Sequence, residues 1–363
     1  MQKREINVDF CRIIATLFVI ILHIFGEGGI LREANPGKAT YWVAWFLEIA
    51  AYCAVNLFAL ITGYVMVNRT INKRQIIQLW FQVFFYSVLF SLLFFFFIPE
   101  TRTIKDIIVA ILPVTGGVWW YISSYFAVFF CIPILNTAIH HMHPQMLKRI
   151  LTVILFGICV VDCIVPKDAF SVNGGYSPIW LIIMYLFGAA IKVYNIKEKT
   201  TAARCIRCYL SMIIVTFLSK AVIFTATNLV FGQAKFDRIL ITYTSVTIVF
   251  ASVFLFLFCL KINTGNQIQK VVRFVAPATL GVYLIHAHPY VFRFLLNDAF
   301  AAYAHKPALV MVLYVLATAM GIFLLCVTIE KVRIQLFKLV KISRLCDIIG
   351  KKATELYAIF VKE

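Results

Sequence analysis

The stretch INVDFCRIIATLFVIILHIF, residues 6–25, decides the fold class of this chain. It is twenty residues long and almost wholly apolar, which is the length that a helix needs to cross the hydrocarbon core of a bilayer. Similar windows recur along nearly the whole sequence, and 62% of the 363 residues are apolar whereas only 14% are charged. Soluble domains are nearer half apolar and a quarter charged. The sequence therefore predicts an all-α protein that spans a membrane many times.

About ten membrane-spanning helices are predicted from these windows. The segment 104–113 is too short to cross and ends in Pro113, so we expect it to lie at the membrane interface. No loop is long enough to hold a soluble domain, which makes residues 1–335 a single membrane domain. Residues 336–363 mix basic and apolar side chains, so we expect an amphipathic cytoplasmic tail that contacts membrane lipids. The predicted spans cover residues 6–25, 41–67, 76–98, 118–139, 146–165, 177–194, 209–231, 239–260, 271–296 and 308–329.

The lysines and arginines orient these spans. The formal net charge is +18, which in a soluble protein would suggest nucleic acid as a partner. Here 23 of the 34 basic residues fall in one set of connecting segments and the tail, and nine fall in the other set. Cytoplasmic loops carry the excess of Lys and Arg. With an even number of spans, both termini are predicted to be cytoplasmic, and no nucleic-acid partner is expected.

Three ionisable residues lie in the first predicted span: Asp9, Arg12 and His23. Ionisable groups inside a membrane are costly unless they are paired or face a wet cavity. Asp9 and Arg12 are three residues apart and can form an ion pair on a helix. Arg12 and His23 are eleven residues apart, about three turns plus 20°, so both lie on one face, roughly 16 Å apart along the helix. The alternative is an interfacial anchor at Asp9 and Arg12, with His23 bonded to a backbone carbonyl.

This pattern resembles the opening helix of the acyltransferase-3 family, the integral-membrane O-acyltransferases that modify bacterial surface glycans. Four further stretches resemble the family's motifs in the right order, so that the likeness covers roughly residues 5–335. They are NLFALITGYVMVNR (56–69), GGVWWYISSYFAVFFCIPILN (116–136), LGVYLIHAHPYV (280–291) and TIEK (328–331).

The chain also departs from the family pattern. The family often has two arginines three apart after the second span, whereas this sequence has Arg69, Lys73 and Arg74. Val332 stands where the closing motif usually has proline. Many members carry an extracytoplasmic hydrolase-like domain that has no counterpart here. Transfer is therefore expected to be completed by the membrane domain.

The resemblance implies a bacterial cytoplasmic-membrane enzyme with an acyl-CoA donor, most commonly acetyl-CoA, and a hydroxyl acceptor on a cell-surface polysaccharide or lipid-linked glycan. Arg12, Lys73 and Arg74 are expected to bind the CoA phosphates, because arginine offers a planar fork of donors. Glu330 is expected either to pair with a basic loop or, as the resemblance implies, to belong to the donor site. His23 is expected to act as general base, with an acyl-histidine intermediate as the alternative. Asp9 would hold Arg12 in place.

For some other polar and aromatic residues, the sequence indicates a function less specifically. Trp119, Trp120 and Tyr121 could either anchor a helix at the interface or stack on a sugar. Tyr283 and His286 could line the same cavity as His23. His286 and His288 have no carboxylate beside them, so no metal is expected.

Three more ionisable residues lie within predicted spans. Glu48 and Asp162 lie towards the outer ends of theirs, where either the acceptor or water could contact them. Lys220 has no partner that the sequence identifies.

The rival class is a transporter or flippase for a small molecule or lipid-linked sugar, since buried charges and a central cavity would also serve a carrier. The sequence shows no repeat between its halves and no pair of Gly/Pro-broken spans in matching positions. These absences favour the enzyme.

Overall fold

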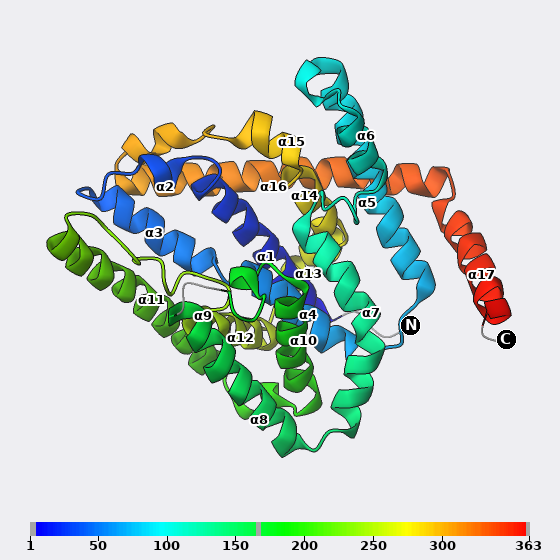
Figure 1. The fold of residues 1–363 in the computed structure, drawn as a ribbon, viewed down its shortest axis with the longest axis horizontal. Coiled ribbons are helices and arrows are strands. Elements are labelled where there is room, and N and C mark those ends of the chain that lie inside the picture. Colours follow the sequence, from blue (N-terminus) through cyan, green and yellow to red (C-terminus); the bar gives the residue numbers. More distant parts are fainter. Residues whose placement is uncertain (1–4, 165–167, 361–363) are drawn as a thin grey trace.

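The computed structural model describes residues 5–164 and 168–360, and over these ranges every regular element is a helix (Figure 1). This confirms the all-α prediction. Long helices form the bundle, and short ones lie in the connections between them. The long helices are α1 (Ile6–Phe25), α3 (Ala39–Ala51), α4 (Ala54–Met66), α5 (Lys73–Phe97), α7 (Trp120–His141), α8 (Pro144–Ile154), α10 (Pro178–Val193), α11 (Ala202–Phe231), α12 (Val246–Lys261), α13 (Asn266–Val275), α14 (Thr279–His286), α16 (Ala308–Leu339) and α17 (Ile342–Phe360). The short ones include α2 (Ile30–Glu33), α6 (Ile104–Ile111), α9 (Val160–Ile164) and α15 (Pro289–Val291).

Seven helical segments in the described part of the chain are long and apolar enough to cross a membrane. The helices α10 and α12 are apolar but shorter. The predicted fifth span is α8 followed by a π-helical turn, Leu155–Cys159, and then α9, while its last residue, Val165, lies outside the described residues. The chain is therefore a multi-pass membrane protein, and the count of ten spans stays a prediction.

Two predicted spans are broken in the structure. The second breaks at Tyr52 and Cys53, between α3 and α4, and the Tyr209 hydroxyl donates to the carbonyl of Ala50 beside the break (2.8 Å). Such a partner lets a helix break within a membrane without leaving a backbone group unsatisfied. The ninth breaks after His286, because Pro289 has no N–H to donate and disfavours helical geometry in the residue before it.

Three other spans have bounds that differ from the predicted ones by seven residues or more. The seventh helix, α11, begins at Ala202 rather than at 209. The eighth helix begins at Val246 rather than at 239, because Tyr243 uses its backbone in tertiary bonds: its N–H donates to Gly174 O (3.2 Å), and its carbonyl accepts from the Asn56 amide (2.9 Å). The tenth helix, α16, runs on to Leu339 instead of ending at 329. Glu330 therefore lies inside a helix and not at its end.

The helix ends gather at two opposite ends of the bundle. At one, which we call the basic end, the Asn7 amide donates to the carbonyls of Leu260 and Ile262 (2.8 and 3.0 Å). There, too, Lys192 pairs with Glu5 (2.9 Å). At the opposite end, backbone bonds join residues 27–28 to residues 298–300, and Arg32 pairs with Asp298. The basic end is the one that the positive residues predict to be cytoplasmic.

The tail forms α17, which lies beside the start of α5 in Figure 1. The Arg74 guanidinium pairs with Asp347 of α17 (3.3 Å). The helical form of the tail agrees with expectation, and its contact with lipid stays a prediction. The segment α6 is an eight-residue helix with exposed isoleucines, too short to cross a bilayer, as expected for residues 104–113.

The closest helix crossing in the core joins α4 to α10 through two glycines. A Cβ added at Gly63 would overlap the carbonyl oxygen of Tyr185, and one added at Gly188 would overlap that of Leu60. Small residues let helix backbones approach closely in membranes, where packing rather than hydrophobic burial drives association. This crossing fixes α4, which forms one wall of the cavity described below.

Gly63→Ala is expected to destabilise the fold by roughly 1–3 kcal/mol, because two backbones must separate to admit the methyl group. Thermal unfolding in detergent measures the effect. Gly321→Ala is the matched control, since Gly321 lies in α16 with nothing near its Cβ direction. Equal unfolding temperatures for the two variants would contradict the close crossing.

Candidate active site

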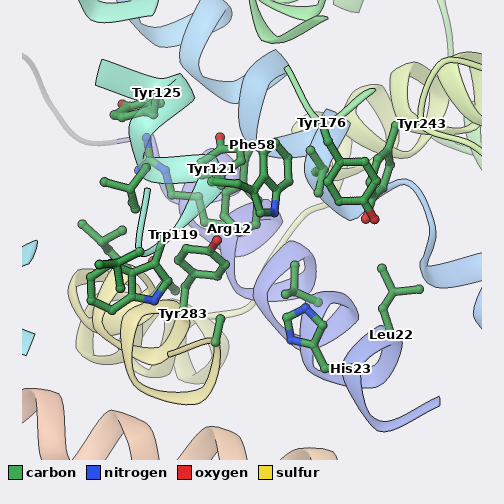
Figure 2. Close-up of a pocket in the computed structure, with 18 of the residues that line it drawn as sticks. Arg12, Leu22, His23, Phe58, Trp119, Tyr121, Tyr125, Tyr176, Tyr243 and Tyr283 are labelled. Carbon is green, nitrogen blue, oxygen red and sulfur yellow. The ribbon is translucent and has the colours of Figure 1, made fainter. Parts of the chain in front are cut away.

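A cavity of about 980 Å³ runs through the bundle between its two ends (Figure 2). Gln75 and Leu79 line it near the basic end, where α5 begins. Glu27 and Asn297 line it at the opposite end. The cavity therefore extends along the bundle from the basic end towards the opposite end.

Helix α1 contributes both Arg12 and His23 to the lining. The two side chains lie on the same side of α1, because eleven residues of an α-helix make about three turns plus 20°. Figure 2 shows both side chains on α1 beside the cavity. An anion held at Arg12 and a group reacting at His23 would thus share one space.

Asp9 fixes the arginine. The Arg12 Nη1 atom donates to Oδ1 of Asp9 at 2.6 Å, and the aspartate side chain is only 1% exposed, against 28% for the arginine. Thr16 donates its hydroxyl to the Arg12 carbonyl (2.8 Å). A buried carboxylate on one side leaves the rest of the guanidinium fork available to the cavity.

A second histidine lies against His23. The ring centroids of His23 and His286 are 5.1 Å apart, and the Phe292 ring meets His23 edge-on at 4.6 Å. His286 Nδ1 lies 2.6 Å from the carbonyl oxygen of Val282, and since a carbonyl only accepts, Nδ1 carries the proton and Nε2 the lone pair. His286 is buried and is not among the lining residues. It lies behind His23 and does not line the cavity as the sequence predicted. Contact between His286 and the acceptor stays a prediction.

The four other predicted acceptor residues all line the cavity. Trp119 is 2% exposed and packs on His288 (5.3 Å), which is not the position of an interfacial anchor. Tyr121 and Tyr283 meet with ring centroids 6.0 Å apart. The structure thus favours a wall of the cavity over a lipid-facing belt for Trp119, Trp120, Tyr121 and Tyr283. Their contact with a sugar stays a prediction.

The predicted donor residues other than Arg12 lie away from this cavity. Lys73 and Arg74 are exposed at the start of α5, neither lines the cavity, and Arg74 is paired with the tail. The sequence could not show that α17 packs beside that part of α5 and pairs with Arg74.

Glu330 is fully buried in a network of its own. It accepts hydrogen bonds from the Tyr86 hydroxyl (2.6 Å) and the Gln82 amide (3.1 Å), and it pairs with Arg333. Gly281 makes room for it, since a Cβ there would overlap the carboxyl group. Glu330 lines neither this cavity nor the cleft next to it, and its place in the donor site stays a prediction. In the structure it holds Arg333.

That cleft, of about 420 Å³, opens beside the cavity at the basic end and shares Gln75, Leu79 and Leu280 with it. Arg333 and Lys338 of α16 line it. Sequence reasoning missed this pair because both residues lie beyond the predicted end of the tenth span, and Lys338 lies in the amphipathic tail that we expected on the membrane surface. A longer α16 carries them to the cleft.

Sequence reasoning also missed Tyr52, Tyr176 and Tyr243, which line the cavity far from the basic end. Tyr52 lies at the helix break, and the other two lie just before α10 and α12. No spacing in the sequence relates them, because loops from three parts of the chain bring them together. Glu48, on α3, lines the same region.

Lys220 is not part of the cavity lining. It pairs with Asp237, and its Nζ lies 3.9 Å from the centroid of the Trp45 ring. Arg238 lies 4.6 Å from the centroid of the same ring. These contacts tie the connection before α12 to α3, which gives Lys220 a structural role. In residues 5–164 and 168–360, no three His, Cys, Asp or Glu side chains come together as metal ligands.

These features define a multi-pass helical membrane protein with a largely apolar and aromatic cavity that carries a few polar side chains and reaches towards both ends of the bundle. A family model described as an acyltransferase domain, Acyl_transf_3, matches residues 5–330. Because the match covers most of the chain, the protein belongs to the acyltransferase-3 family and is a membrane acyltransferase. No curated protein and no solved structure shows significant similarity to it.

Glu330→Ala is expected to lower stability by about 3–5 kcal/mol, because it leaves Arg333 without its buried partner. Thermal unfolding without any donor measures this. Glu198→Ala, which removes an exposed carboxylate in a loop at the same end, should change little. An unaltered unfolding temperature for Glu330→Ala would contradict the structural role.

Proposed function

We propose that this acyltransferase moves an acyl group, most commonly acetyl, from cytoplasmic acyl-CoA to a hydroxyl of a cell-surface polysaccharide or lipid-linked glycan in the bacterial cytoplasmic membrane. The observation that carries the proposal is the single cavity lined by both Arg12 and His23. A phosphorylated donor and a hydroxyl acceptor approach from opposite sides of a membrane, and this cavity gives them a common space.

The donor enters from the basic end. Its phosphates bind at the cleft lined by Arg333 and Lys338 and at Arg12, whose planar fork suits phosphate oxygens. The wall shared by cleft and cavity then leads the pantetheine arm towards His23, roughly 16 Å along α1 from Arg12. In this arrangement Arg333 and Lys338 take the role that the sequence gave to Lys73 and Arg74.

His23 acts as general base. Its Nδ1 is buried, which leaves Nε2 for the reacting groups. The neutral imidazole takes the proton of the acceptor hydroxyl while that oxygen attacks the thioester carbonyl. The tetrahedral intermediate collapses, the C–S bond breaks, and the imidazolium returns the proton to the CoA thiolate. Attack by His23 itself, giving an acyl-histidine, is the alternative path to the same products.

The transporter alternative is not favoured, because the family to which the chain belongs is one of acyltransferases. The two classes also differ in a simple assay. An acyltransferase releases free CoA from acetyl-CoA when acceptor is present, whereas a carrier does not.

His23→Ala is expected to lower acetyl transfer by roughly 10²–10⁴-fold, the usual contribution of a positioned acid–base group. The assay is release of CoA by purified protein with acetyl-CoA and surface glycan, alongside donor binding. His141→Ala, which changes an exposed histidine at the end of α7, is the control. Full activity in His23→Ala would make the catalytic assignment wrong.

Arg12→Lys is expected to weaken acetyl-CoA binding by about tenfold, because a lysine keeps the charge but cannot offer two parallel donors. Isothermal titration with acetyl-CoA measures the dissociation constant. Arg149→Lys, at an exposed site of the same end, should leave it unchanged. Equal affinities in both variants would count against a phosphate contact at Arg12.

A further inference from the structure

Glu48 is a buried acid without an evident structural task. It is 7% exposed and lines the cavity, and its Oε2 atom has no hydrogen-bond partner in the part of the chain that the structure describes. None of the salt bridges among those residues includes it. A carboxyl group in a membrane protein costs several kcal/mol unless something polar faces it. What faces Glu48 is the cavity.

The surroundings hold Glu48 in place and bring the Arg238 cation near its carboxyl group, but they give Oε2 no hydrogen bond among the described residues. Trp45, three residues earlier on α3, has Lys220 on its ring at 3.9 Å and Arg238 at 4.6 Å. Lys220 is also paired with Asp237. These contacts fix α3 against the connection that carries Tyr243, so that Glu48 and Tyr243 are positioned by the same cluster.

An aromatic wall lines the same part of the cavity. The Tyr52 and Tyr243 rings lie 4.7 Å apart, Tyr176 and Tyr243 lie 5.1 Å apart, and Trp120 packs on Tyr176 at 4.7 Å. Figure 2 shows Tyr176 and Tyr243 side by side, across the view from Trp119. Each of these rings is a lining residue, and each tyrosine adds a hydroxyl that can donate or accept.

We infer that this part of the cavity is a subsite for one uncharged pyranose ring of the acceptor. Glu48 accepts hydrogen bonds from two neighbouring ring hydroxyls, and the tyrosine rings pack against the apolar C–H face of the sugar. A carboxyl group has two oxygens that can bond two hydroxyls at once, and aromatic rings give large contact area with fixed geometry. The other side chains of this part of the cavity, Tyr52, Tyr176 and Tyr243, offer only hydroxyl groups and aromatic rings, which suit the hydroxyls and the C–H face of an uncharged sugar.

This inference rests on the proposed function, which identifies the bound sugar as part of the acceptor. Its test does not depend on that function, because it measures sugar binding directly. Saturation-transfer NMR on the purified full chain would probe the methyl glycosides of glucose, galactose, mannose and N-acetylglucosamine, with methyl glucosaminide as a cationic comparison. At least one neutral glycoside should bind. Glu48→Gln and Tyr243→Leu should each weaken that binding about tenfold or more. Acetyl-CoA affinity should stay unchanged.

Glu33→Gln is the matched control, since Glu33 is an exposed carboxylate outside the cavity lining. Thermal unfolding of each variant verifies that it folds. Tyr243→Phe keeps the ring, so it separates the contribution of the ring to sugar binding from that of the hydroxyl group. Undiminished sugar binding in Glu48→Gln, a preference for methyl glucosaminide, or no binding of any neutral glycoside would overturn the subsite. If sugar binding is lost as expected but no acetyl transfer occurs with any acceptor, then the proposed reaction is wrong and the subsite stands.

Discussion

The constraint on which the rest of this structure depends is that a membrane interior offers no water to a buried polar group. Every ionisable side chain within the helices therefore needs a partner or a cavity. Lys220 has Asp237, Glu330 has Arg333, and Arg12 has Asp9. In each pair the two opposite charges lie in contact, and the contact holds two elements or two turns of one helix together.

Some buried polar side chains have an atom without a hydrogen-bond partner among the described residues. His23 and Glu48 both line the cavity, and each has a buried atom without a hydrogen-bond partner among the described residues. Burying an unsatisfied polar atom usually costs about 1–3 kcal/mol. Because Glu48 also lines the cavity, its unpartnered oxygen marks where a bound molecule belongs.

Breaks in the helices bring side chains to the lining of the same cavity. The break between α3 and α4 places Tyr52 on the lining, and the break after α14 ends the helix that carries Tyr283. The connection before α12 stays unwound because Asn56 and Gly174 bond to the backbone of Tyr243. Irregular backbone at membrane depth is tolerated where it is buried in protein or lines a cavity. Here it brings aromatic side chains from distant parts of the chain to one wall.

The sequence by itself determined what depends on local pattern. Apolar windows defined a helical membrane protein, and the helical period placed Arg12 and His23 on one side of α1. Only the tertiary structure decided what depends on contacts between distant segments. Glu330 is held by hydrogen bonds from Gln82 and Tyr86 on α5, and Arg74 is paired with Asp347 of α17. The gathering of Tyr52, Tyr176 and Tyr243 likewise depends on three separate connections, whose paths no period or composition encodes.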